Sequence, residues 1–114
     1  MSYVWALLVV LILLQAEAAS HWLIGGHHSC GTWTAERRVN GAITWQLESW
    51  VVGYLSGWAR ASSGNPLAGL EEDAVHAWID NYCSRNPLDT ISDAADELKI
   101  HLLKVSRNPA EIVR

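Results

Sequence analysis

Apolar residues recur every three or four positions along most of the chain, and nowhere do they alternate strictly with polar residues as in a half-buried strand. The clearest stripe lies within residues 42–61 and consists of Ile43, Leu47, Trp50, Val51, Tyr54 and Trp58. Because Trp45 and Val52 lie on nearly the opposite side, the pattern predicts a long helix at the centre of a bundle. Gly53 and Gly57 disfavour a helix by about 1 kcal/mol each, so we expect a second backbone to pack closely against them.

Three further segments predict helices around this one, namely residues 32–39, 71–84 and 87–106. The last begins with the strongest local signal in the chain, since Asn86 is a favourable N-cap and Pro87 a favourable first helical residue. Its apolar face consists of Leu88, Ile91, Ala94, Ala95, Leu98, Leu102 and Val105. The pattern therefore predicts an all-α fold, a small orthogonal bundle of three to four helices.

The opposite face of the last predicted helix is acidic. Asp89, Asp93, Asp96 and Glu97 follow one another at i+3 and i+4 spacing, which places like charges side by side. A solvated face is the simplest interpretation. The alternative is an acid sensor, because protonation would leave the chain strongly positive and self-repulsion loosens compact states.

The N-terminal sequence is typical of an export signal rather than of a folded domain. Residues 4–14 form an unbroken apolar run that is too short to cross a bilayer comfortably, and Ala16-Glu17-Ala18 is a favourable cleavage site. We therefore expect a signal peptide that is cleaved after Ala18. The alternative is an uncleaved membrane anchor, in which the apolar helix is extended by Trp22, Leu23 and Ile24.

Length and composition indicate one domain. The chain has 114 residues, of which 50% are hydrophobic and 18% charged, and this excludes a wholly disordered acidic tail. A formal net charge of −4 argues against binding to the phosphates of nucleic acid. We expect a signal peptide at residues 1–18, a flexible segment at 19–29, a helical domain at 30–106 and a C-terminal tail at 107–114.

Two cysteines, Cys30 and Cys83, remain in the exported part. In an oxidising compartment, such a pair in a small domain predicts one disulfide. For a loop of this length, chain entropy predicts a stabilisation of about 4 kcal/mol. The alternative is a zinc site formed by the two cysteines with His27 and His28, although no C-x-x-C spacing supports it.

The remaining candidate chemistry is sparse, since the sequence contains no nucleophile motif, phosphate-binding loop or H-E-x-x-H. His76 lies at the edge of an apolar stripe and is expected to be surface or half-buried, with Asp80 as a helix-surface partner four residues later. His21, His27 and His28 form the one histidine cluster and could bind copper, nickel or zinc weakly. We expect no dedicated metal site and no cofactor.

Tryptophan is the unusual component of the composition, with seven residues and no phenylalanine. Trp33, Trp45 and Trp58 are the candidate residues for binding a partner. Core filling is the simpler interpretation of Trp58, which lies on the main stripe. Trp45 faces away from that stripe, so we expect it to pack under the N-terminal segment; the alternative is an exposed anchor for a partner.

Three stretches of the chain carry a family resemblance: SCGTW at residues 29–33, WVVGYLSGW at 50–58 and WIDNYCSRNPLDTISDAADEL at 78–98. Together they resemble the HdeA-like periplasmic proteins of Gram-negative bacteria, with the single cysteine pair and the C-x-x-N-P junction at residues 83–87 as the best-matched features. The resemblance spans residues 29–103 and implies a helical, disulfide-bonded periplasmic domain. The chaperones of this family dissociate and partly unfold in acid, and then hold denatured clients on exposed apolar surface.

We therefore expect a periplasmic, non-enzymatic protein that acts by contact with a protein partner or an unfolded client, and that could form a homodimer. An HdeA-like stress chaperone is the first hypothesis. The alternative is a periplasmic immunity protein of the Tai type, which is also helical and disulfide-bonded and neutralises a secreted toxin. A third hypothesis is weak metal binding through the N-terminal histidines. No nucleic-acid partner is expected, and membrane contact is expected only transiently through the signal peptide.

Overall fold

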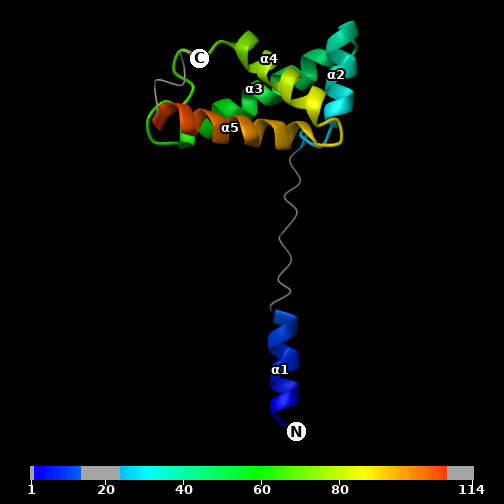
Figure 1. Ribbon diagram of the computed structural model, residues 1–114, viewed down its shortest axis with the longest axis vertical. Coiled ribbons are helices and arrows are strands. Elements are labelled where there is room, and N and C mark those ends of the chain that lie inside the picture. Colours follow the sequence, from blue (N-terminus) through cyan, green and yellow to red (C-terminus); the bar gives the residue numbers. More distant parts are fainter. Residues whose placement is uncertain (1, 14–23, 108–114) are drawn as a thin grey trace.

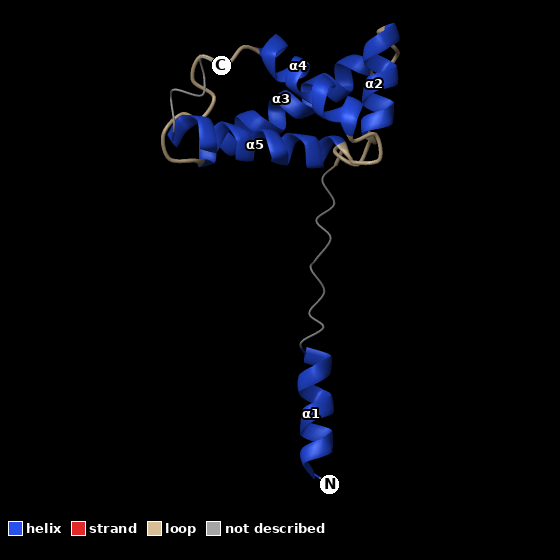
Figure 2. Ribbon diagram, viewed as in Figure 1, coloured by secondary structure: helices blue, strands red, loops and turns tan. Residues whose placement is uncertain are grey.

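The described part of the chain, residues 2–13 and 24–107 of a computed structural model, is helical. It contains α1 (Ser2–Leu13), α2 (Cys30–Val39), α3 (Thr44–Ala61), α4 (Glu72–Arg85) and α5 (Ile91–Arg107). Within these residues there is no strand, only an isolated antiparallel bridge between Ser29 and Thr90 (Figure 2). The all-α prediction is confirmed, with five helices in place of three to four because α1 falls in the predicted signal peptide.

Helix α1 stands apart from the other four helices (Figure 1). Its side chains from residue 2 to residue 10 are exposed. Among the described residues, no helix has the length and apolar character that crossing a membrane requires. The expected cleavage site at residues 16–18 and the tail from residue 108 onwards lie outside the described residues.

The core lies between α2, α3, α4 and α5. It contains Cys30, Trp33, Leu47, Val51, Leu55, Val75, Ile79, Cys83, Ile91, Ala94, Ala95 and Leu98. Helix α3 contributes Leu47 and Val51 of its predicted stripe, together with Leu55, which the stripe did not include, and all three are at most 1% exposed. Tyr54 and Trp58 of the same stripe pack at the margin of the core.

A disulfide and four backbone hydrogen bonds join the start of α2 to the turn between α4 and α5. The predicted disulfide between Cys30 and Cys83 is confirmed, and it closes a sequence separation of 53 residues. The backbone bonds are Cys30 N to Asp89 O (2.7 Å), Gly31 N to Pro87 O (3.1 Å), Ile91 N to His28 O (2.9 Å) and Ser92 N to Gly26 O (3.2 Å). Residues 24–29, expected as part of a flexible segment, are therefore held against the bundle.

Helix α5 begins later than predicted, and the prediction of Asn86 as its N-cap is wrong. Asn86 is the C-cap of α4, and its Nδ2 donates to the Tyr82 carbonyl at 2.9 Å. The start of α5 is capped by Thr90, whose Oγ1 accepts from the Asp93 N–H at 3.2 Å, while Asp93 Oδ2 accepts from the Thr90 N–H at 2.9 Å. Leu88, predicted to face the core, is 94% exposed because it lies in the turn before the helix.

The outer face of α3 differs from its predicted environment. A Cβ placed on Gly53 or Gly57 would meet no atom within 4 Å, so the expectation of a closely packed second backbone is wrong. Trp45 is 78% exposed, so the prediction that it packs under the N-terminal segment is also wrong. That segment packs instead on Trp50, whose Nε1 donates to the Ile24 carbonyl at 2.6 Å.

Candidate functional site

Carboxylates on the inner sides of the helices link each helix of the bundle to a neighbour. Asp80 of α4 is the most connected of them. Its Oδ1 accepts from the indole Nε1 of Trp33 at 2.7 Å and from Arg37 Nε at 2.9 Å, and its Oδ2 accepts from Arg37 Nη2 at 2.6 Å. One carboxylate therefore receives three hydrogen bonds from two side chains of α2.

These bonds stabilise the charged form of Asp80. Burial alone would raise the pKa of Asp80, but the hydrogen bonds from Arg37 and from the Trp33 indole outweigh burial and hold that pKa below its ordinary value. In turn, the hydrogen bond to Asp80 raises the pKa of the Arg37 guanidinium. The Asp80 side chain is 37% exposed, so solvent screens part of this interaction.

Two further carboxylates link α2 to the first turns of α3. Glu48 Oε1 accepts from Arg37 Nη1 at 2.7 Å, so the same guanidinium connects α2 to both α3 and α4. Glu36 Oε2 accepts from the Ile43 backbone N–H at 3.1 Å and from the Thr44 hydroxyl at 3.3 Å. Glu36 thereby binds the N-terminal turn of α3, which has no side-chain cap of its own.

The link between α3 and α5 is a triad of Tyr54, Asp96 and Lys99. Asp96 Oδ1 accepts from the Tyr54 hydroxyl at 2.6 Å and from Lys99 Nζ at 2.8 Å, and Lys99 also donates to the Tyr54 oxygen at 3.1 Å. Burial together with the bond to Asp96 raises the pKa of Tyr54. Burial lowers the pKa of Lys99, but the bonds to Asp96 and Tyr54 outweigh it and raise that pKa overall.

Helix α4 is linked to the turn before α5 by a fifth carboxylate. The Tyr82 hydroxyl donates to Asp89 Oδ2 in a short hydrogen bond. This bond, with a smaller effect of burial, raises the pKa of Tyr82 to about 12. The Tyr82 ring also stacks on Trp78 at a centroid distance of 5.7 Å, so the contact combines polar and aromatic parts.

His76 is buried between α2 and α4, which corrects the expectation of a surface or half-buried residue. Its ring meets the edge of Trp33 at a centroid distance of 6.0 Å. Its Nε2 is buried with no hydrogen-bond partner and lies 3.8 Å from a Glu72 carboxylate oxygen. The expected pairing with Asp80 does not form a hydrogen bond, because that carboxylate is occupied by Trp33 and Arg37.

The three candidate tryptophans occupy different environments. Trp33 is fully buried, so it has no surface to offer a partner, and its role is to support Asp80. Trp58 packs at the margin of the core, 5.9 Å from Lys99 Nζ. Trp45, at 78% exposure, is the one of the three that is free to contact another protein.

The proposed histidine cluster gains no support as a metal site. The rings of His27 and His28 stack at 4.6 Å, whereas His21 lies outside the described residues. Between residues 24 and 107, no group of three or more His, Cys, Asp or Glu side chains is placed to hold a metal ion. The zinc alternative for the cysteines is wrong because both sulfurs are joined in the disulfide.

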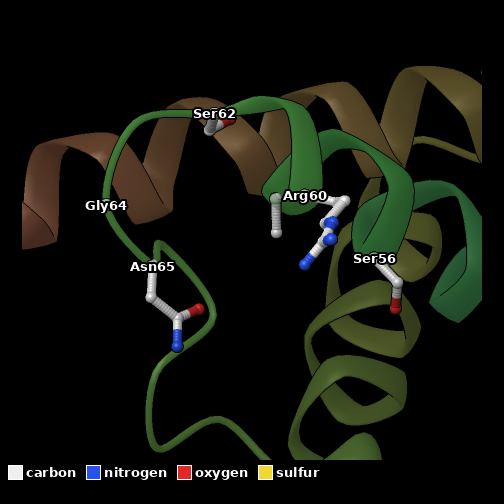
Figure 3. A pocket seen from close by; sticks show the side chains of 6 residues that line it. Ser56, Arg60, Ser62, Gly64 and Asn65 are labelled. Atoms are coloured by element: carbon white, nitrogen blue, oxygen red, sulfur yellow. The ribbon is translucent and has the colours of Figure 1, made fainter.

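Two polar hollows open on the surface. One, of about 320 Å³, is lined by Thr34, Arg37, Arg38 and Asp80 and lies over the α2–α4 link. The other, of about 360 Å³, lies between the end of α3 and the following loop, and Arg60 projects into it (Figure 3). In the first hollow the Asp80 carboxylate is already engaged by Trp33 and Arg37, so we take the carboxylate links between helices as the candidate functional site.

Sequence reasoning identified the acidic residues of α5 but missed the network centred on Arg37 and Asp80. A signal was present, because Trp33 and Arg37 are four residues apart and therefore lie on one helix face. A cation next to a core tryptophan needs a counter-ion, but the helix that supplies it depends on the tertiary structure.

Comparisons with protein-family models, with curated proteins and with solved structures give no match to this chain.

Proposed function

We propose that this protein is a non-enzymatic, exported helical domain that acts by protein contact, as an HdeA-like acid-stress chaperone of the periplasm. At neutral pH the domain is closed. In acid the bundle opens while the disulfide keeps α2 and α4 covalently linked, and the core side chains that become exposed then hold unfolded clients and prevent their aggregation.

The observation that carries this proposal is the number of interhelical contacts that depend on a charged carboxylate. Glu48, Asp80, Asp89 and Asp96 each accept a hydrogen bond from another helix or from the end of one. Protonation removes the charge that strengthens these bonds, whereas a disulfide is insensitive to acid. Eight Lys and Arg and five His residues would then repel one another without compensating charge.

The disulfide supports the proposed compartment, because such bonds persist in oxidising compartments such as the periplasm. It also supports a reversible mechanism. A chain whose helices remain covalently linked after opening has less conformational freedom to lose when it closes again.

The experiment is an aggregation assay with an acid-denatured client at about pH 2 to 3. We expect light scattering by the client to fall when this protein is present, together with dye binding and a lost near-UV signal of its own tryptophans. The same protein at pH 7 is the control and should neither bind dye nor protect the client. Unchanged client aggregation at low pH would rule out the chaperone function.

A second candidate is an immunity protein of the Tai type, which would bind a secreted toxin at neutral pH. The exposure of Trp45 favours it, because large exposed aromatic side chains are typical anchors of protein interfaces. The test is a binding measurement with the product of an adjacent toxin-like reading frame. Trp45→Ala should weaken binding at least tenfold, whereas Trp58→Leu should have a smaller effect because Trp58 packs at the margin of the core.

A further inference from the structure

We infer that α3 is the helix that acid releases, and that the apolar face uncovered by its release is the surface that holds an extended apolar segment of an unfolded polypeptide. The inference rests on the proposed function and specifies its moving part. Helices α2, α4 and α5 would remain together while α3 swings away from them.

Links that do not depend on acid hold α2, α4 and α5 together. The disulfide joins the start of α2 to the end of α4. Backbone bonds from Cys30, Gly31 and Ile91 join the start of α2 to the turn before α5. Acid also weakens the bonds that Asp80 and Asp89 make between these helices, but neither the disulfide nor the backbone bonds contain a group that titrates between pH 7 and pH 2. The disulfide and the backbone bonds therefore keep these three helices in place after the carboxylates are protonated.

Carboxylates accept four of the hydrogen bonds that link α3 and its N-terminal turn to the rest of the bundle. Glu48 binds Arg37 of α2, and Asp96 of α5 binds Tyr54. Glu36 binds the backbone of Ile43 just before the helix.

Three links of α3 do not depend on a carboxylate. Trp50 donates to the Ile24 carbonyl at 2.6 Å, and Lys99 donates to the Tyr54 oxygen at 3.1 Å. Thr44 donates to the Glu36 carbonyl at 3.0 Å, which holds the start of α3 next to the end of α2. That end of α3 is therefore the hinge.

The charged groups around Glu48 and Asp96 determine which interactions α3 loses when these two carboxylates are protonated. At Glu48 they are Arg37 of α2 and Asp80 of α4, with the buried His76 of α4 behind Trp33. At Asp96 the charged neighbour is Lys99. In acid, Glu48 no longer attracts Arg37 across the contact between α3 and α2. On the side that faces α5, the bond from Tyr54 to Asp96 loses the charge that strengthens it, while Lys99 keeps its charge.

Release of α3 would uncover a continuous apolar surface. Leu47, Val51 and Leu55 project from it into the core at one-helical-turn spacing, bordered by Tyr54 and Trp58. Contact with apolar side chains is non-directional and tolerates many sequences. Such a strip fits an extended apolar segment of a denatured chain, which is exposed under the same acidic conditions.

The test is hydrogen exchange measured by mass spectrometry on the full-length protein at pH 7 and at pH 3, with rates corrected for the intrinsic pH dependence of exchange. Protection of residues 44–61 should fall at least tenfold more than protection of residues 72–85 and 91–107. A uniform loss of protection, or an unchanged α3, would overturn the inference.

A pair of variants gives a second test at pH 7. Glu48→Gln with Asp96→Asn removes two α3 links and should increase exchange of residues 44–61 at least tenfold. The control, Asp73→Asn with Glu97→Gln, changes the charge equally at two exposed side chains outside α3 and should leave that exchange within a factor of two. Equal exchange of residues 44–61 in both variants would contradict the inference.

The client assay separates this inference from the proposed function. If acid releases α3 selectively but no client is protected, the chaperone function fails and the release of α3 stands. If clients are protected while α3 keeps its protection from exchange, the chaperone function stands and α3 is not the moving part.

Discussion

Trp33 and Arg37 lie one helical turn apart on α2, and both donate to the carboxylate of Asp80. This arrangement satisfies the indole N–H of a fully buried tryptophan and neutralises a guanidinium close to the core. Removing the carboxylate would leave both donors without their charged acceptor. The local energetics of the α2–α4 contact therefore depend on one side chain of α4.

Asp80→Asn should lower the free energy of unfolding at pH 7 by about 1 kcal/mol, less than is typical of hydrogen bonds to charged groups, because Asp80 is partly exposed and solvent screens the interaction. The pKa of Asp80 is lowered in the folded protein, so its contribution is complete above about pH 4 and disappears as the pH falls further. Urea unfolding of both proteins at pH 7 and pH 2.5 should show a smaller difference at the lower pH. Glu97→Gln, on the exposed side of α5, is the control and should change stability little.

At the scale of single helices, the start of α5 shows two competing caps. Asn86 and Pro87 resemble the beginning of a helix, yet the carbonyl groups of Pro87 and Asp89 and the N–H of Ile91 pair with residues 28–31. These residues therefore cannot form a helical turn, and the helix begins after Thr90 instead.

Thr90→Ala should destabilise the protein by about 1 kcal/mol, because it removes the side chain that caps the first turn of α5. Asn86→Ala loses only a bond to the last turn of α4 and should cost less. Thermal or urea unfolding of the two variants would compare them directly. A larger cost for Asn86→Ala would contradict this assignment of the cap.

The glycines of α3 provide a second test at this scale. Because Gly53 and Gly57 are exposed and have space for a Cβ, alanine at each should stabilise the helix by about 0.5 to 1 kcal/mol. Gly26→Ala is the contrasting variant and should be destabilising, since its Cβ would collide with the Trp50 ring. Urea unfolding measures all three. A loss of stability in Gly53→Ala would indicate a neighbour on that face.

At the scale of the whole molecule, the disulfide connects elements that are distant in sequence but adjacent in the bundle. Cys30 and Cys83 are both buried at the start of α2 and the end of α4. A bundle of four helices has a small core, so a covalent link across it contributes a large share of the stability.

Cys30→Ser with Cys83→Ser should reduce the free energy of unfolding by about 2 to 5 kcal/mol, because the unfolded chain regains the freedom of a long loop. Urea unfolding of the double variant, compared with the oxidised protein, measures this change. Reduction of the wild-type protein with dithiothreitol is the parallel control. Equal stability with and without reductant would show that the disulfide is not important to the fold.

Much of the fold follows from local patterns. Helical periodicity predicted the bounds of α3 and α4 to within a few residues. An apolar stripe at 3.6-residue spacing is stable when it is buried against a core, so the stripe indicates both the helix and its buried face. Two cysteines in a small chain with an expected export signal were enough to predict their pairing. These features depend on residues close together in sequence, or on there being only one pair to form.

Only the tertiary structure decided which side chains meet across helices. The rotation of the helices against one another decides whether Trp45 and Gly53 face another element and whether His76 is buried. It also decides which carboxylate accepts the hydrogen bonds of Arg37. A single helix places each residue on a face but does not say what lies opposite that face. The packing of α2 against α4, held by the disulfide, supplies that information, and with it the network of carboxylates that links the helices.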